Sequence, residues 1–300
     1  MRVNPNLVPD VLASLQQSQM NLNTALQQVS TGKRVTVPSD DPAASAGMVQ
    51  NTIETGNVDQ YTQNVNNVLS MVQTADSALS SVVSSLTQAV TLGTEGANGT
   101  TSAANQQAIA AQIQGLITSI VAQANVSYQG SYVFGGTATS QPPYVANATS
   151  PSGYTYNGNT GVNSVAIGDQ TSLQVNLPGS QIFSNASADV LGSLSSLVSA
   201  LQSGNTSGIQ TATTNITSAL NNVSQQRVFY GNVQSQLNAQ ETYLQQETVT
   251  LTSQATSLVG VDMAKAAVTL AQAQTANSAA LAAAAKVLPT TLLNYLSPPQ

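Results

Sequence analysis

The side chains best placed to do chemistry are two adjacent carboxylates, Asp40 and Asp41. Such a pair could hold a metal ion or act in acid–base catalysis. Their context, Ser-Asp-Asp-Pro, favours a structural role. Asp41 stands where a helix N-cap is expected, and Pro42 falls at the first helical position, where its missing N–H costs nothing. We therefore expect Asp41 and Pro42 to begin a helix.

Other catalytic arrangements lack the residues they need. The chain has no His and no Cys, which removes most acid–base pairs, most nucleophiles, the usual zinc sites and disulfides. The glycine-rich segment 130–136 lacks the lysine of a phosphate-binding loop and is not followed by a helical pattern. Triplets such as Asn147-Ala148-Thr149 are expected by chance in a sequence so rich in Asn, Ser and Thr. We expect a protein that is not an enzyme and uses no cofactor or metal.

Charge is scarce throughout the chain. Charged residues make up 6% of the 300 residues, against roughly 25% in ordinary globular proteins. The net charge is −6 and no Lys or Arg occurs between Arg34 and Arg227. A nucleic-acid partner is therefore not expected, because it requires a basic patch. Neither a cleaved signal peptide nor a membrane-spanning segment is expected, since no basic start followed by an apolar run and no stretch of ~18 apolar residues is present.

Apolar residues at three- and four-residue intervals predict long helices near both ends of the chain. We expect helices over about 12–29, 43–93, 109–120, 191–201, 223–258 and 262–287, with a break at Pro289. In the second and fifth helices the apolar residues form heptads, which are typical of a coiled coil. The positions expected to serve packing or assembly are Leu12, Leu15, Leu22, Leu26, Val58, Val65, Val72, Leu79, Leu86, Leu237, Leu244, Leu251, Leu258, Leu292, Leu293 and Leu296.

Two uses of these apolar rows stay open. Heptads most often form a core within one chain, and we favour this use for the rows of the second and fifth helices. The end segments carry thin, Ala- and Gln-rich stripes that bury little alone, so packing on partners is favoured there. The two uses are compatible, because a bundle can present its outer faces to neighbouring chains.

The middle of the chain has a different texture. From about 130 to 185, Gly, Pro and Tyr concentrate and short runs alternate between apolar and polar residues. Asn157-Gly158, between Tyr154 and Thr160, predicts a hairpin with a type I′ turn. The fold class that follows is mainly α: a long antiparallel helical bundle or coiled coil formed by the N- and C-terminal regions, with a small inserted β-rich domain.

Several motifs resemble the flagellin superfamily, and within it the subunits of the hook–filament junction. They include Ser-Thr-Gly-Lys-Arg-Val-Thr-Val-Pro-Ser-Asp-Asp-Pro at 30–42, Asn-Val-Ser-Tyr-Gln-Gly-Ser-Tyr-Val-Phe-Gly-Gly at 125–136 and Leu-Val-Gly-Val-Asp-Met-Ala at 258–264. Filament flagellins usually continue Asp-Asp-Ala-Ala-Gly where this chain has Asp-Asp-Pro. The closing segment Leu-Leu-Asn-Tyr-Leu at 292–296 is also similar to junction subunits.

The resemblance implies a structural adaptor at the hook–filament junction, outside the cell and involved in motility. Such a subunit would be secreted through the type III export apparatus without a cleaved signal peptide. It would form a homo-oligomeric ring or helical array between a neighbouring hook-associated protein and flagellin, and a chaperone is an open further partner. Terminal helices 1–35 and 262–300 would form an inner tube, segments 36–136 and 186–261 the bundle core, and 137–185 an outer β-rich insert. The alternatives are filament flagellin and, more distantly, an extracellular adhesin that binds through the insert.

Overall fold

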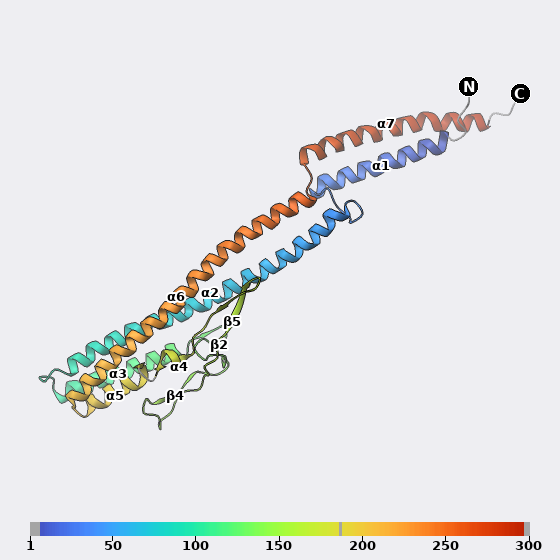
Figure 1. Cartoon of the computed structure of the whole chain (residues 1–300). Coiled ribbons are helices and arrows are strands. Elements are labelled where there is room, and N and C mark those ends of the chain that lie inside the picture. Colours follow the sequence, from blue (N-terminus) through green and yellow to red (C-terminus); the bar gives the residue numbers. More distant parts are fainter. Residues whose placement is uncertain (1–6, 186–187, 297–300) are drawn as a thin grey trace. The chain divides into compact units, whose positions relative to one another are not determined.

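The computed structural model describes residues 7–185 and 188–296 and is mainly helical, with short paired strands (Figure 1). The chain divides into two compact units. Unit 1 comprises Met1–Asn57 with Glu247–Gln300, and unit 2 comprises Val58–Gln246. This confirms the predicted fold class of long N- and C-terminal helices with a small β-rich insert. The finer division into terminal, core and insert domains stays a prediction.

Unit 1 is built from both ends of the chain. Helix α1 (Leu7–Thr31) and helix α7 (Met263–Leu296) lie side by side and run antiparallel (Figure 1). The unit also holds the beginning of α2 (Pro42–Gly96) and the end of α6 (Thr206–Val259). Both of these helices continue without interruption into unit 2.

The break predicted at Pro289 is wrong, because α7 runs through this proline to Leu296. Proline removes one backbone hydrogen bond and costs about 3 kcal/mol in a helix interior. The sequence before it is rich in alanine, the residue with the highest helix propensity, and the helix continues despite that cost. The side chains of Leu292, Leu293 and Leu296 lie outside the described residues.

Unit 2 is a helical bundle with α2 and α6 as its long antiparallel members. Asp76 of α2 pairs with Arg227 of α6, and Gly93 further along α2 lies against Thr213 further back along α6. Helices α3 (Ala103–Ala124) and α5 (Val190–Gln202) pack against each other beside them (Figure 1). The heptad rows face the interior: fully buried members are Val65, Val72, Leu79, Leu86, Val223, Tyr230 and Leu237.

Within residues 7–185 and 188–296, eight short strands form four separate antiparallel pairs. The pairs are β1 (Ser127–Tyr128) with β2 (Ser131–Tyr132), β3 (Tyr144–Ala146) with β4 (Tyr154–Tyr156), β5 (Ser164–Gly168) with β6 (Thr171–Gln174), and β7 (Ser184–Asn185) with β8 (Ala188–Asp189). A one-turn helix, α4 (Gly179–Ile182), lies between β6 and β7.

The hairpin predicted at Asn157-Gly158 is wrong. Tyr154 and Tyr156 lie in β4, which pairs antiparallel with the preceding strand β3. The connection between β3 and β4 includes Gly153, whose φ is +76°. A type I′ turn needs positive φ at both central residues, whereas Asn157 and Gly158 have none. The rings of Tyr144 and Tyr156, 5.2 Å apart, hold β4 against β3.

The β-rich segment is anchored in the helical bundle. Phe134 and Phe183 meet edge to face at 5.5 Å, and the ring of Tyr230 from α6 completes the cluster at 6.4 Å from Phe134. The Tyr230 hydroxyl accepts a hydrogen bond from the Leu177 amide at 3.2 Å, and burial raises the pKa of Tyr230. Side-chain amides of both long helices also hold β5. Asn64 of α2 donates to the Ala166 carbonyl oxygen, and Gln240 of α6 donates to the Ile167 carbonyl oxygen.

Candidate assembly surface

The two carboxylates singled out in the sequence serve the backbone of the loop that precedes α2. Asp41 Oδ1 accepts a hydrogen bond from the Ala44 amide at 3.0 Å, which is N-cap geometry, and Pro42 is the first residue of α2. Asp40 Oδ2 accepts from the amides of Thr36 and Val37. These bonds stabilise the charged forms. They hold the pKa of Asp40 and of Asp41 below the ordinary value, with Arg34 adding to the effect at Asp41.

The seam between α1 and α7 is made mostly of small and polar side chains, with Leu15 and Leu22 partly buried beside them. Ala25 of α1 and Ala266 and Ala284 of α7 are its buried apolar members. Beside them, Ser18 Oγ and Asn277 Oδ1 are buried without a hydrogen-bond partner among the described residues. Alanine buries little area, at roughly 25 cal/mol per Å². The pair therefore has only a thin core of its own.

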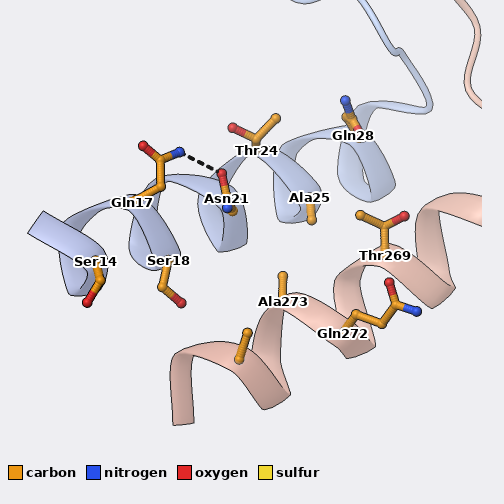
Figure 2. A pocket seen from close by; sticks show the side chains of 11 residues that line it. Ser14, Gln17, Ser18, Asn21, Thr24, Ala25, Gln28, Thr269, Gln272 and Ala273 are labelled. Atoms are coloured by element: carbon orange, nitrogen blue, oxygen red, sulfur yellow. Dashed lines mark hydrogen bonds between the residues drawn. The ribbon is translucent and has the colours of Figure 1, made fainter. Parts of the chain in front are cut away.

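One face of this pair is a neutral polar groove. Figure 2 shows Ser18 and Ala25 of α1 directed toward α7, where Ala273 lies opposite them, while other hydroxyl and amide side chains of α1 project away from α7. The groove encloses about 620 Å³, and its α1 wall is Ser14, Gln17, Ser18, Asn21, Thr24, Ala25 and Gln28. Gln17 donates to Asn21 at 3.0 Å along this wall. The lining carries no charged side chain.

The opposite face of the pair carries exposed apolar side chains. A helix turns about 100° per residue, so Leu12 and Leu26 fall on the other side of the seam from Gln17 and Asn21. On α7 the same count places Met263 and Leu281 opposite Gln272. Leu12 and Leu26 are each 44% exposed, Met263 is 51% exposed and Leu281 48%. We call these four residues the apolar face.

Charge is also kept off the apolar face. The described residues of α1 and α7 include three charged side chains, Asp10, Lys265 and Lys286. By the same angular count, all three fall outside the sector that holds the apolar face. The apolar face is a set of four separate Leu and Met side chains, because exposed Gln19 and Gln274 share its sector. It is a candidate packing surface, and not a continuous apolar patch.

The sequence-predicted packing residues separate into two groups. Val58, Val65, Val72, Leu79, Leu86, Leu237, Leu244 and Leu251 are buried, and Leu258 is partly buried. Leu15 and Leu22 flank the α1–α7 seam and are partly buried, whereas Leu12 and Leu26 are exposed. The structure thus brings the heptad residues into the chain's own core and leaves part of the end stripes uncovered. Their role in assembly stays a prediction.

Sequence reasoning missed the partner of Arg227. Its guanidinium binds Asp76 through two hydrogen bonds, of 2.9 and 3.2 Å, and this contact raises the pKa of Arg227. Both side chains are about one third exposed, 33% and 35%, so the pair contributes little stability, of the order of 1 kcal/mol or less. A signal was available, because Arg227 is the single basic residue between Arg34 and Lys265.

A buried amide was also missed. Asn51 is 3% exposed and donates to the Leu251 carbonyl oxygen at 2.9 Å, within the part of α2 and α6 that belongs to unit 1.

Among the described residues, no group of three or more His, Cys, Asp or Glu side chains could hold a metal ion. No helix within the described ranges is long and apolar enough to cross a membrane.

Comparisons with known proteins identify relatives of both chain ends. The model of the bacterial flagellin N-terminal helical region matches residues 7–139, and that of the C-terminal helical region matches residues 213–296. Together they span more than half of the chain. No curated protein matches the sequence significantly.

Solved structures with the same fold are hook-associated proteins. A putative flagellar hook-associated protein from Vibrio parahaemolyticus aligns with TM-score 0.68 at 19% identity, covering 74% of this chain and 100% of that one. FlgL from Bacillus cereus aligns with TM-score 0.60 at 20% identity, covering 69% and 99%. The flagellar junction protein FlgL from Legionella pneumophila aligns with TM-score 0.60 at 14% identity, covering 71% and 100%.

Proposed function

Because this chain belongs to the flagellin family, we propose that it is a structural subunit of the bacterial flagellum that acts as the adaptor at the hook–filament junction, like hook-associated protein 3. The role is to join other proteins, and no chemical step is needed for it. The junction, in preference to the filament, is supported by the Asp-Asp-Pro motif and by the fold shared with hook-associated proteins.

The observation that carries the proposal is the two-sided pair of α1 and α7. Its seam is thin, with alanines as the buried members, and its apolar face leaves four Leu and Met side chains about half exposed. Covering the exposed half of one such side chain contributes about half of the ~1.5–3 kcal/mol that full burial would give. A ring or helical array of copies would provide that cover, and the inner-tube arrangement of the terminal helices fits it.

The neighbours we propose are a second hook-associated protein on one side and flagellin on the other. Delivery to this place would use the flagellar type III export apparatus, with an export chaperone as a further candidate partner. The mature protein would then be extracellular and carry no cleaved signal peptide.

Deletion of the gene in the source bacterium, followed by electron microscopy, tests the role. We expect intact hooks without filaments, and flagellin shed into the medium, because an adaptor is needed to hold the first filament subunits. Filaments of normal length in the deletion strain would overturn the proposal. Loss of filaments with no other filament protein in the medium would instead identify the chain as flagellin itself.

A further inference from the structure

The chain contains two Asn-Gly dipeptides, Asn98-Gly99 and Asn157-Gly158. In such a dipeptide the backbone nitrogen after the asparagine can attack the side-chain amide, because glycine has no Cβ to shield that nitrogen. The attack closes a five-membered ring and releases ammonia. It requires the dipeptide to rearrange, and the structure places the two dipeptides in opposite surroundings.

Asn98-Gly99 lies in the exposed turn that joins α2 to α3. In the described part of the chain, residues 98–101 are hydrogen-bonded only to one another and to Glu95. Apart from its chain neighbours, no described atom lies within 4 Å of the position of a Cβ on Gly99. A turn held by a few local bonds opens at low free energy, so this one can rearrange without disturbing the bundle.

The side-chain amide of Asn98 is also polarised for this reaction. Its Oδ1 accepts hydrogen bonds from the Thr100 amide at 3.3 Å and from the Thr100 hydroxyl at 3.1 Å. When a nitrogen adds to Cγ, this oxygen becomes an oxyanion, and hydrogen bonds to a charged oxygen are roughly twice as strong as those to a neutral one. The two donors therefore stabilise the transition state more than the ground state. The attacking group, the Gly99 amide, makes no hydrogen bond with any residue that the structure describes.

Asn157-Gly158 is instead clamped in the β-rich segment. The Asn159 amide donates to the Gly135 carbonyl oxygen at 3.1 Å, and the Tyr156 hydroxyl donates to the Asn159 carbonyl oxygen at 3.0 Å. A Cβ on Gly158 would collide with the Tyr156 ring and with the Gly135 carbonyl oxygen. The contacts with Gly135 join positions far apart in the sequence, so this dipeptide can rearrange only when the segment opens.

We propose that Asn98 is a site of spontaneous deamidation in the folded protein and that the fold protects Asn157 from the same reaction. The Gly99 nitrogen bonds to Asn98 Cγ, the Cγ–Nδ2 bond breaks, and ammonia leaves with the proton that the Gly99 nitrogen loses. Water then opens the succinimide at either of its two carbonyl carbons, which gives aspartate or isoaspartate. The new carboxylate lies beside Glu95 at the C-terminal end of α2, where a negative charge is unfavourable. The reaction needs no enzyme and does not depend on the proposed junction role.

Incubation of the full chain in mildly alkaline buffer, with and without urea, tests the proposal. Mass spectrometry of the peptides that contain Asn98 and Asn157 measures the extent of deamidation at each residue over time. In urea both residues should react at similar rates, because glycine follows each of them. In the folded protein Asn98 should react about tenfold or more faster than Asn157, since each hydrogen bond that must open first slows a reaction about two- to tenfold. Similar rates at the two residues in the folded protein, or an Asn98 that reacts only in urea, would overturn the proposal.

Substitutions in the turn test the two groups that act on Asn98, after circular dichroism has verified equal helix content. Thr100→Val removes the hydroxyl donor and should slow deamidation of Asn98 by about two- to tenfold. Thr100→Ser keeps a hydroxyl and should react like the parent protein. Gly99→Ala places a methyl group in open space beside the attacking nitrogen and should also slow the reaction. An unchanged rate in Thr100→Val would overturn the role of Thr100, and an unchanged rate in Gly99→Ala would overturn attack by the Gly99 nitrogen.

Discussion

At the scale of single residues, the adjacent carboxylates Asp40 and Asp41 hold backbone amides. Asp40 and Asp41 accept four of the hydrogen bonds that shape the loop before α2, three of them from backbone amides. Two adjacent carboxylates could have suggested acid–base chemistry, but their hydrogen bonds give them a structural role at the start of α2. The same interactions depress both pKa values, which makes the loop sensitive to acid.

The pH dependence of this loop has a definite sign. A carboxyl whose folded pKa is lowered contributes stability that is complete above its unfolded pKa and is lost as the pH falls through the folded value. We expect the loop to stay formed at pH 5–7 and to loosen below the ordinary value of 3.8. Amide chemical shifts of Thr36, Val37 and Ala44 during an acid titration measure this. In Asp40→Asn the response of Thr36 and Val37 should vanish while that of Ala44 remains; an unaltered response would contradict the assignment.

Leu244 tests whether the apolar residues that recur every seven positions along α6 form a buried core. Its side chain is 2% exposed, so Leu244→Asp loses about 1.5–3 kcal/mol of apolar burial and several kcal/mol more for an unpaired buried carboxylate. We expect a large drop in melting temperature. Gln245→Asp, one position along at an exposed site, is the matched control and should change stability by less than about 0.5 kcal/mol. Equal melting temperatures would mean that the row is not buried in solution.

At the scale of elements, helices could be predicted and strand pairing could not. The periodicity of Val65, Val72 and Leu79 is a local property of the sequence, and the structure buries all three. Asn157-Gly158 has the local preference for a hairpin turn, but the rings of Tyr144 and Tyr156 decide the pairing, and no local pattern encodes that contact. The apolar face likewise became visible only when the α1–α7 pairing showed which side of each helix stays uncovered.

The attachment of the β-rich segment leads to a prediction about its removal. Replacing residues 137–185 by a Gly/Ser linker would remove Phe183 and Leu177, the partners of Phe134 and Tyr230. Loss of one buried Phe alone costs about 3–5 kcal/mol, so we expect unit 2 to melt at a much lower temperature. Shortening only the 147–153 connection to Asn-Gly keeps β3 paired with β4 and should leave the melting temperature nearly unchanged. If both variants melt alike, the segment is not part of the bundle's core.

At the scale of the whole molecule, stability is distributed unevenly along the chain. The bundle of unit 2 buries large side chains such as Leu79, Leu86 and Tyr230 completely, whereas the α1–α7 seam depends on alanines. A subunit that joins others benefits from this division. If the α1–α7 pair is the assembly surface, as we propose, the bundle can fold before assembly and the surface to be covered lies on the element with the thinner core.

The last prediction follows from that imbalance: in the free monomer, amides of residues 12–29 and 264–286 should exchange with solvent much faster than those of residues 109–120 in α3. Ordering the backbone costs about 1–2 kcal/mol per residue. Isolated helices need a packed face to offset it. The α1–α7 seam buries only alanines deeply and covers its leucines in part, and the oxygens of Ser18 and Asn277 have no hydrogen-bond partner within the described ranges. In assembled material the same amides should become protected, because neighbouring copies would cover Leu12, Leu26, Met263 and Leu281.

Hydrogen exchange on a monomer verified by sedimentation measures this protection. Ala25→Leu is an informative variant, since a larger side chain at the 2% exposed seam position should perturb the pair without altering α3. Strong protection of both end helices in the verified monomer would contradict the prediction and would mean that the thin seam is sufficient by itself.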